Sequence, residues 1–375
     1  MPNVSSNLKN LIPCLGVEGR ILLDCVKPAF DPKAPEIQDY FTQFIDWTFL
    51  LQLAEKHRVI PLLYQRLNQL SNVTLPPKFK AQLRVKFYET SRQNLQYTNQ
   101  LLEILSIFEQ QNIAVIPYKG VLLAMLAYGK VSFRQIWDID LLIHPKDVLK
   151  SRACLLEQRY KIIETFDREQ SFVDAHNQVE IDLHWGLTPL YFHLELPFSE
   201  LWEKRRPIEL FDKQIMTFSE DDLLIILCIQ IAKDCWERRL RIEHLSKICD
   251  IGYLIHRNNF WNWRNLIAQA QQMGIERVFY FGLSLAQELL SIDLPTELCL
   301  SISKTPSINY LRRQVCQELF CQNDKSLYVP NQTYMNYQFR FKQLIFYLKL
   351  RERPIDRIKH ISEIFKFISR AAVQS

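Results

Sequence analysis

Residues 138 to 143 read Asp-Ile-Asp-Leu-Leu-Ile, and this pattern constrains the fold more than any other feature of the chain. Side chains of an extended segment alternate, so Asp138 and Asp140 share one face while Ile139, Leu141 and Ile143 share the other. We therefore predict a strand with one apolar face and one face that carries two carboxylates. Close carboxylates provide the oxygen ligands that Mg²⁺ or Mn²⁺ prefers, although a solvated strand edge would show the same pair.

A third acid on a second strand distinguishes a metal site from a solvated edge. Residues 179 to 185 alternate in the same way, which places Glu180, Asp182 and His184 on one face. If this strand lies beside the first, Asp182 completes a site of three carboxylates, with Glu180 as the alternative third ligand. We expect His184 to support the site or to pack, and not to bind the cation directly.

Upstream of the two aspartates, a glycine separates a short apolar segment from a helical one. The turn Lys119-Gly120 would let the backbone approach phosphate oxygens close to the amino end of a helix. Lys119 and Arg134 provide the positive charge to pair with a triphosphate. Each signal also has an ordinary explanation, because Lys-Gly is frequent in plain turns and a single arginine is often structural.

The rest of the chain is dominated by helical patterns, and only eight of its 375 residues are glycine. We expect a helical region over residues 1–110, an α/β core over 111–218 and a second helical region over 219–375. Extended segments are expected at residues 113–117, 139–143, 161–165, 171–175 and 179–185, with a hairpin turn at His176-Asn177. The segment around Pro306 and residues 321–332 are expected to be loops.

Charge and composition favour an ordinary cytoplasmic protein without a membrane span. The sequence has no long apolar run and no secretory signal, and its nine cysteines follow no metal-binding or disulfide spacing, so we expect reduced thiols. The net charge of +5 is modest, but residues 340–370 contain nine basic and three acidic side chains. This basic region would fit an acidic partner, and it would equally fit the solvated face of terminal amphipathic helices.

The order and spacing of these motifs resemble the polymerase-β-like nucleotidyltransferases, in particular a large bacterial group within them. The resemblance rests on Lys119-Gly120, on Arg134 shortly before the strand of residues 138–142, and on Asp-Leu-His-Trp at 182–185, and it extends over about residues 57–290. Better-known members of the superfamily carry Gly-Ser at the phosphate turn. Relatives also often have histidines where Gln230 and Asp234 stand here.

The resemblance implies an α+β fold in which a small mixed sheet is flanked by helical regions. It also implies a metal-dependent enzyme that moves a nucleoside monophosphate from a triphosphate to an acceptor hydroxyl. Asp138, Asp140 and Asp182 would be the metal-binding and catalytic residues, and Lys119, Gly120 and Arg134 would bind the donor. The alternative is a nucleotide-binding or inactive module that acts through protein or RNA contacts. The acceptor stays open between protein, RNA and small molecule, and Trp137 and Trp185 are core or rim aromatics that could also stack on a base.

Overall fold

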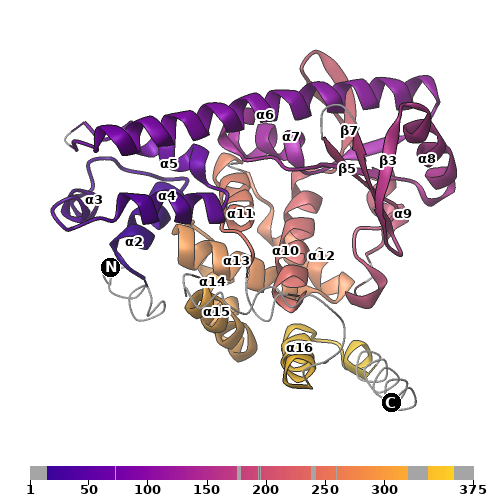
Figure 1. The fold of residues 1–375 in the computed structure, drawn as a ribbon. Coiled ribbons are helices and arrows are strands. Elements are labelled where there is room, and N and C mark those ends of the chain that lie inside the picture. The colour runs from indigo at the N-terminus through magenta and orange to yellow at the C-terminus, as the bar shows by residue number, and fades with distance from the viewer. Residues whose placement is uncertain are drawn as a thin grey trace.

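The computed structural model describes residues 15–71, 73–174, 179–192, 194, 196–237, 242–258, 260–319 and 337–358. It shows a helix-dominated α+β protein with one small mixed sheet, as expected (Figure 1). Helix α6 (Pro77–Gln110) runs along the molecule from the N-terminal helices to the sheet, and the C-terminal helices lie below it (Figure 1). The helices that precede it are α2 (Val17–Cys25), α3 (Pro35–Tyr40), α4 (Trp47–Lys56) and α5 (Ile60–Leu67).

The central sheet has five strands in the order β1, β2, β5, β4, β3. Their bounds are β1 Val115–Pro117, β2 Ile139–Ile143, β3 Tyr160–Thr165, β4 Glu169–Asp174 and β5 Glu180–His184. Strands β2 and β5 are parallel, and the other neighbours are antiparallel. Each predicted extended segment contains or overlaps one of these strands. Residue 175 of the segment 171–175 and the turn expected at His176-Asn177 lie outside the described residues.

Alternation along β2 and β5 gives the sheet two different faces. The residues at 139, 141, 143, 181 and 183 are buried in an apolar cluster with Leu101, Ile104 and Phe108 of α6. The opposite face carries Asp140, Asp182 and His184. It is not a solvated edge, because Asp140 is only 5% exposed. Both faces of the sheet are therefore covered at this point, and the Asp140 carboxylate lies inside the molecule.

Short elements connect the strands. They are α7 (Gly120–Leu123), a π-helical turn (Ala124–Tyr128), 3₁₀ turns at Val131–Phe133, Pro145–Asp147 and Leu190–Phe192, and helices α8 (Val148–Glu157) and α9 (Phe198–Glu203). A separate antiparallel hairpin, β6 (Arg206–Leu210) and β7 (Lys213–Thr217), was not predicted. It lies next to β1, where the Thr217 hydroxyl donates to the Pro117 carbonyl at 3.2 Å.

The C-terminal part consists of helices. They are α10 (Glu220–Glu237), α11 (Ser246–Arg257), α12 (Trp263–Met273), α13 (Glu276–Leu290), α14 (Thr296–Ser303), α15 (Pro306–Glu318) and α16 (Tyr337–Leu350). The loop expected around Pro306 is wrong, because Pro306 is the first residue of α15. Proline is tolerated there since the first N–H groups of a helix have no partner within the helix. The second expected loop, 321–332, lies outside the described residues.

The expected division into residues 1–110, 111–218 and 219–375 stays a prediction. Its inner boundaries fall between α6 and β1 and between β7 and α10. One buried apolar cluster contains residues of all three parts, including Leu63, Leu142 and Phe279. The parts therefore share a core.

Seven cysteines lie in the described part of the chain, where all are free thiols and six are buried. Within the same residues, no helix has both the length and the apolar character to cross a bilayer.

The basic C-terminal region is described only in part, up to residue 358. There, Arg351 is buried and pairs with Asp356 at 2.6 Å, and Arg353 donates to the Gln271 carbonyl at 3.1 Å. Lys349 lies over the ring of Tyr310. These side chains contact the protein itself, and an acidic partner for this region remains a prediction.

Candidate active site

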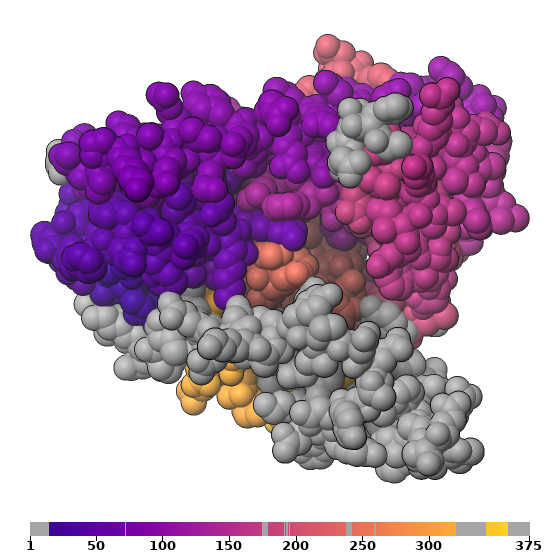
Figure 2. All heavy atoms as spheres, in the orientation of Figure 1, coloured from indigo at the N-terminus to yellow at the C-terminus, as the bar shows by residue number. Residues whose placement is uncertain are grey.

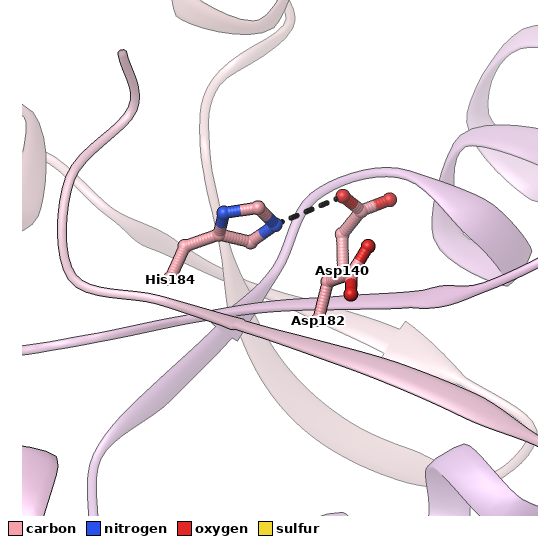
Figure 3. Close-up of side chains that lie close together, drawn as sticks. All are labelled: Asp140, Asp182 and His184. Carbon is pink, nitrogen blue, oxygen red and sulfur yellow. Dashed lines mark hydrogen bonds and ion pairs between the residues drawn. The ribbon is translucent and has the colours of Figure 1, made fainter. Parts of the chain in front are cut away.

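The register of two parallel strands brings two carboxylates together. Asp140 of β2 is the direct partner of Asp182 on β5. Asp140, Asp182 and His184 point toward one another from these strands (Figure 3), and each offers a ligand atom within 4.8 Å of the others. Asp138, which immediately precedes β2, is outside this tight cluster, although it lines the same cavity. The adjacency of the two acidic strands, on which the predicted site depends, is therefore present.

Lys119 also contacts this cluster. Its ammonium Nζ lies 2.9 Å from Asp140 Oδ1, the oxygen that also contacts His184. Burial would lower the pKa of Lys119, but the neighbouring Asp140 carboxylate holds it well above its usual value. Lys119 is therefore charged and is paired with Asp140, and its expected contact with phosphate remains a prediction.

Gly120 is required by the backbone. Its φ is +52°, a conformation that side chains rarely adopt, and an added Cβ would lie 3.1 Å from the carbonyl oxygen of Asp138. The glycine thus allows the start of α7 to pass close to the segment that carries Asp138. Its expected role at a phosphate is a separate matter and remains a prediction.

The three aspartates differ in their electrostatics. Burial and the adjacent Asp140 and Asp182 raise the pKa of Asp138 to about 7. Burial and Asp140 likewise raise the pKa of Asp182 to about 6, although the Ser171 hydroxyl donates to it at 2.6 Å. Burial also opposes ionisation of Asp140, but Lys119 and His184 hold its pKa well below the usual range. Such crowding of acids is relieved when a cation binds.

His184 lies between two carboxylates. Its Nε2 is 3.1 Å from Asp140, and its Nδ1 is 3.3 Å from Glu169, which is directly opposite on β4. Burial would lower the pKa of His184, but these two partners raise it to about 9. The ring is therefore an imidazolium at neutral pH and donates to both acids, which agrees with a supporting role.

Two cavities meet at the aspartates. One of about 250 Å³ and another of about 270 Å³ are lined by both the sheet and the helices α10 and α11. Both cavities are lined by Lys119, Asp138, Asp140, Gln230 and Lys247. Figure 2 shows the molecule hollowed between the N-terminal helices and the strands, with C-terminal helical residues inside the hollow. Asp138 and Asp140 thus lie at the boundary between two polar cavities.

The remaining candidates are distributed unevenly around these two cavities. The first cavity alone is lined by Asp182, His184 and Glu169, and the second alone by Trp137 and Arg134. Glu180, the alternative third ligand, lines neither of these two cavities. Trp185 packs against the apolar cluster on the other face of the sheet.

Arg134 is already paired within the protein. Its Nε and Nη2 donate to the two carboxylate oxygens of Asp250 on α11 at 2.9 and 3.0 Å. Asp250 also accepts a hydrogen bond from the Tyr128 hydroxyl at 2.8 Å. The pair joins the segment before β2 to the C-terminal helices.

Sequence reasoning missed the residues of α6 that position the loop leading to Asp138. Asn94 is buried, donates to the carbonyls of Val131 and Arg134 at 2.7 Å each, and accepts from the N–H of Ile136 at 3.2 Å. A detectable signal was present, because Asn94 continues the apolar stripe of α6 at helical spacing. A polar residue on such a stripe requires partners.

The helix α10 also lines the site. It carries Gln230 and Asp234, the two positions at which relatives often have histidines. Gln230 lines both cavities, and Asp234 lines the first cavity and forms an ion pair with Lys247 of α11. These two helices therefore form the wall that faces the carboxylates.

The protein is of the α+β class and carries an acidic site between two cavities on a mixed sheet. Comparison with known proteins identifies its family. Residues 43–291 match the model of the family described as uncharacterised nucleotidyltransferase, and the chain belongs to that family. A search of curated proteins found no match.

Among solved structures, one similar chain is an antigenic nucleotidyltransferase-like protein from Paracoccidioides brasiliensis. It is 16% identical, with a TM-score of 0.29, over 51% of this chain and 90% of that chain.

Proposed function

We propose that this protein is a metal-dependent nucleotidyltransferase that moves a nucleoside monophosphate from a triphosphate to an acceptor hydroxyl and releases pyrophosphate. The observation that carries the proposal is the register pairing of Asp140 with Asp182, with Asp138 beside them, at a polar cavity. Membership of the nucleotidyltransferase family supports the reaction class.

The donor atoms fit a hard divalent cation, because the acids at 138, 140 and 182 provide carboxylate oxygens. A bound Mg²⁺ or Mn²⁺ would neutralise phosphate charge and orient the reacting groups. Asp138 and Asp140 would hold the cation that accompanies the triphosphate. Asp182 either holds a second cation or takes the proton of the attacking hydroxyl, and its pKa of about 6 suits a base at neutral pH.

Three further residues are proposed to act on the donor phosphates. Lys119 pairs with the triphosphate, and Gly120 lets the backbone approach it. An arginine has five N–H donors, and the Asp250 pair uses those on Nε and Nη2 of Arg134. Arg134 therefore contacts phosphate only through the remaining part of its guanidinium.

Nucleotide binding tests the proposal. We expect calorimetric titration to detect binding of at least one of ATP, CTP, GTP and UTP, and binding to depend on Mg²⁺. Labelled-nucleotide transfer to lysate components should fall at least a hundredfold in Asp138→Asn and Asp140→Asn, because each removes a cation ligand.

Glu180→Gln is the matched control, since it neutralises an acid of the same sheet face that lines neither cavity, and it should keep activity. Equal transfer by wild type and both aspartate variants would refute a catalytic role for these residues. Mg²⁺-dependent binding without transfer would favour the alternative of a nucleotide-binding module.

A further inference from the structure

The two cavities differ in their lining, because Asp182 lines only the first and Trp137 only the second. We infer that the second cavity is the nucleobase site, in which the base of the donor nucleotide stacks on Trp137. The inference rests on the proposed nucleotidyl transfer.

The position of Asp182 separates acceptor from donor. Asp138 and Asp140 line both cavities, whereas Asp182 lines only the first. In nucleotidyl transfer the attacking and leaving oxygens lie on opposite sides of the reacting phosphorus. A hydroxyl that gives its proton to Asp182 approaches from the first cavity, so the leaving pyrophosphate lies on the side of the second. The nucleoside projects sideways from the reacting phosphorus, and its place in the second cavity rests on Trp137.

Trp137 has the properties of a stacking platform. It is 42% exposed, which is unusual for so large an aromatic side chain, and it lines the second cavity. It precedes Asp138 directly, so their Cα atoms are about 3.8 Å apart. A base on its ring is therefore close to the carboxylates at which the phosphates bind. Stacking on an aromatic ring accepts every base, because each base has a π face.

One contact fixes the backbone of the tryptophan, and another lies against its ring. The Tyr97 hydroxyl of α6 donates to the Trp137 carbonyl at 2.5 Å. The guanidinium of Arg58 lies over the indole, 4.7 Å from the ring centroid. A fixed ring loses little freedom when a ligand binds, which favours affinity.

The edges of the second cavity provide groups that can read a base. Gln135, Ser246 and Glu243 line it and together offer hydrogen-bond donors and acceptors. The ring supplies affinity, and these polar groups determine which base is preferred.

The test compares ligands with and without a base. The four nucleoside triphosphates and inorganic tripolyphosphate are titrated, with Mg²⁺, into wild type, Trp137→Ala and Trp137→Phe. Trp137→Ala should weaken the tightest nucleotide about tenfold, within the range measured for base stacking. Tripolyphosphate affinity should stay within about twofold, and Trp137→Phe should recover most of the nucleotide affinity, because a smaller ring still stacks.

Phe260→Ala is the control, because Phe260 is 91% exposed and lines neither cavity. It should bind every ligand as wild type does. Equal nucleotide affinity in wild type and Trp137→Ala would overturn the base site while leaving the proposed function intact. A parallel loss of tripolyphosphate would also overturn it, since the damage would then not concern the base. A wild type that binds no nucleotide would overturn the proposed function, and the base site with it.

Discussion

Asp138 and Asp182 share a cavity and a sheet face, yet each is difficult to ionise. Their pKa values of about 7 and about 6 arise because burial and the negative charge of Asp140 both disfavour a further charge. Asp140 remains charged because Lys119 and His184 contact it. Basic neighbours thus lower the pKa of Asp140, whereas burial and acidic neighbours raise the pKa values of Asp138 and Asp182. A bound cation would favour the ionised form of Asp138 and Asp182.

Cation binding is therefore expected to depend on pH. At pH 6 the raised pKa values leave protons on Asp138 and partly on Asp182, and a cation must displace these protons. At pH 8 both groups are ionised, so the affinity for Mn²⁺ or Mg²⁺ should be about tenfold higher than at pH 6. Calorimetry in buffers of different ionisation enthalpy should show proton release at pH 6. Equal affinity at both pH values would contradict this assignment of charge.

The helix α6 shows how a single element can define a site that it does not line. Asn94 and Tyr97 lie one turn apart and hydrogen-bond the backbone from residue 131 to residue 137. Further along, Leu101, Ile104 and Phe108 pack under the sheet. The same helix therefore supports the strand that carries Asp140 and the loop that carries Asp138.

Asn94→Ala should loosen this loop. Two carbonyls and one N–H lose their partner, and leaving buried polar groups unsatisfied costs about 1–3 kcal/mol of stability. Thermal unfolding should show the loss, and Mg²⁺-nucleotide affinity should fall as well, because Asp138 is no longer held. Asn99→Ala on the exposed side of the same helix is the control and should change stability by less than about 0.5 kcal/mol. Equal behaviour of the two variants would mean that Asn94 does not position the loop.

Sequence patterns predicted the helices and strands that have clear periodicity, and they failed for segments whose structure depends on tertiary contacts. The strands of the central sheet and most helices follow alternation or helical spacing, and Ser219 caps α10 by accepting from the Asp222 N–H. The hairpin β6–β7 was missed because it is short and only half buried. Proline is frequent both in loops and at the first position of a helix, so the pattern around Pro306 alone does not separate the two cases.

At the scale of the whole molecule, buried polar contacts join regions that are distant in sequence. Arg134 and Tyr128 both bond Asp250 of α11. The Leu245 N–H donates to His57 Nδ1 at 3.3 Å, which attaches the N-terminal helices to the residue that precedes α11. The second cavity therefore lies where the N-terminal helices, the central sheet and the C-terminal helices meet.

Asp250→Ala should destabilise the protein strongly. It leaves the buried charge of Arg134 without its partner, and breaking one side of a buried ion pair typically costs about 3–5 kcal/mol. The melting temperature should fall by several degrees. Glu200→Gln provides the comparison, because the Lys204–Glu200 pair is exposed on both sides, and its loss should cost less than about 1 kcal/mol. A melting temperature that is the same in both variants would show that the Arg134–Asp250 pair does not hold the regions together.

The sequence by itself determined the local structure and the chemical types of the site, because both depend on short-range patterns. Alternation placed Asp138, Asp140 and Asp182 on polar strand faces, and the glycine between an apolar and a helical segment indicated the turn at Gly120. Only the tertiary structure decided which groups face one another, because strand register and helix docking are set by contacts between distant segments. Those contacts paired Asp140 with Asp182, directed Arg134 to Asp250, and brought Trp137 to the second cavity beside the carboxylates.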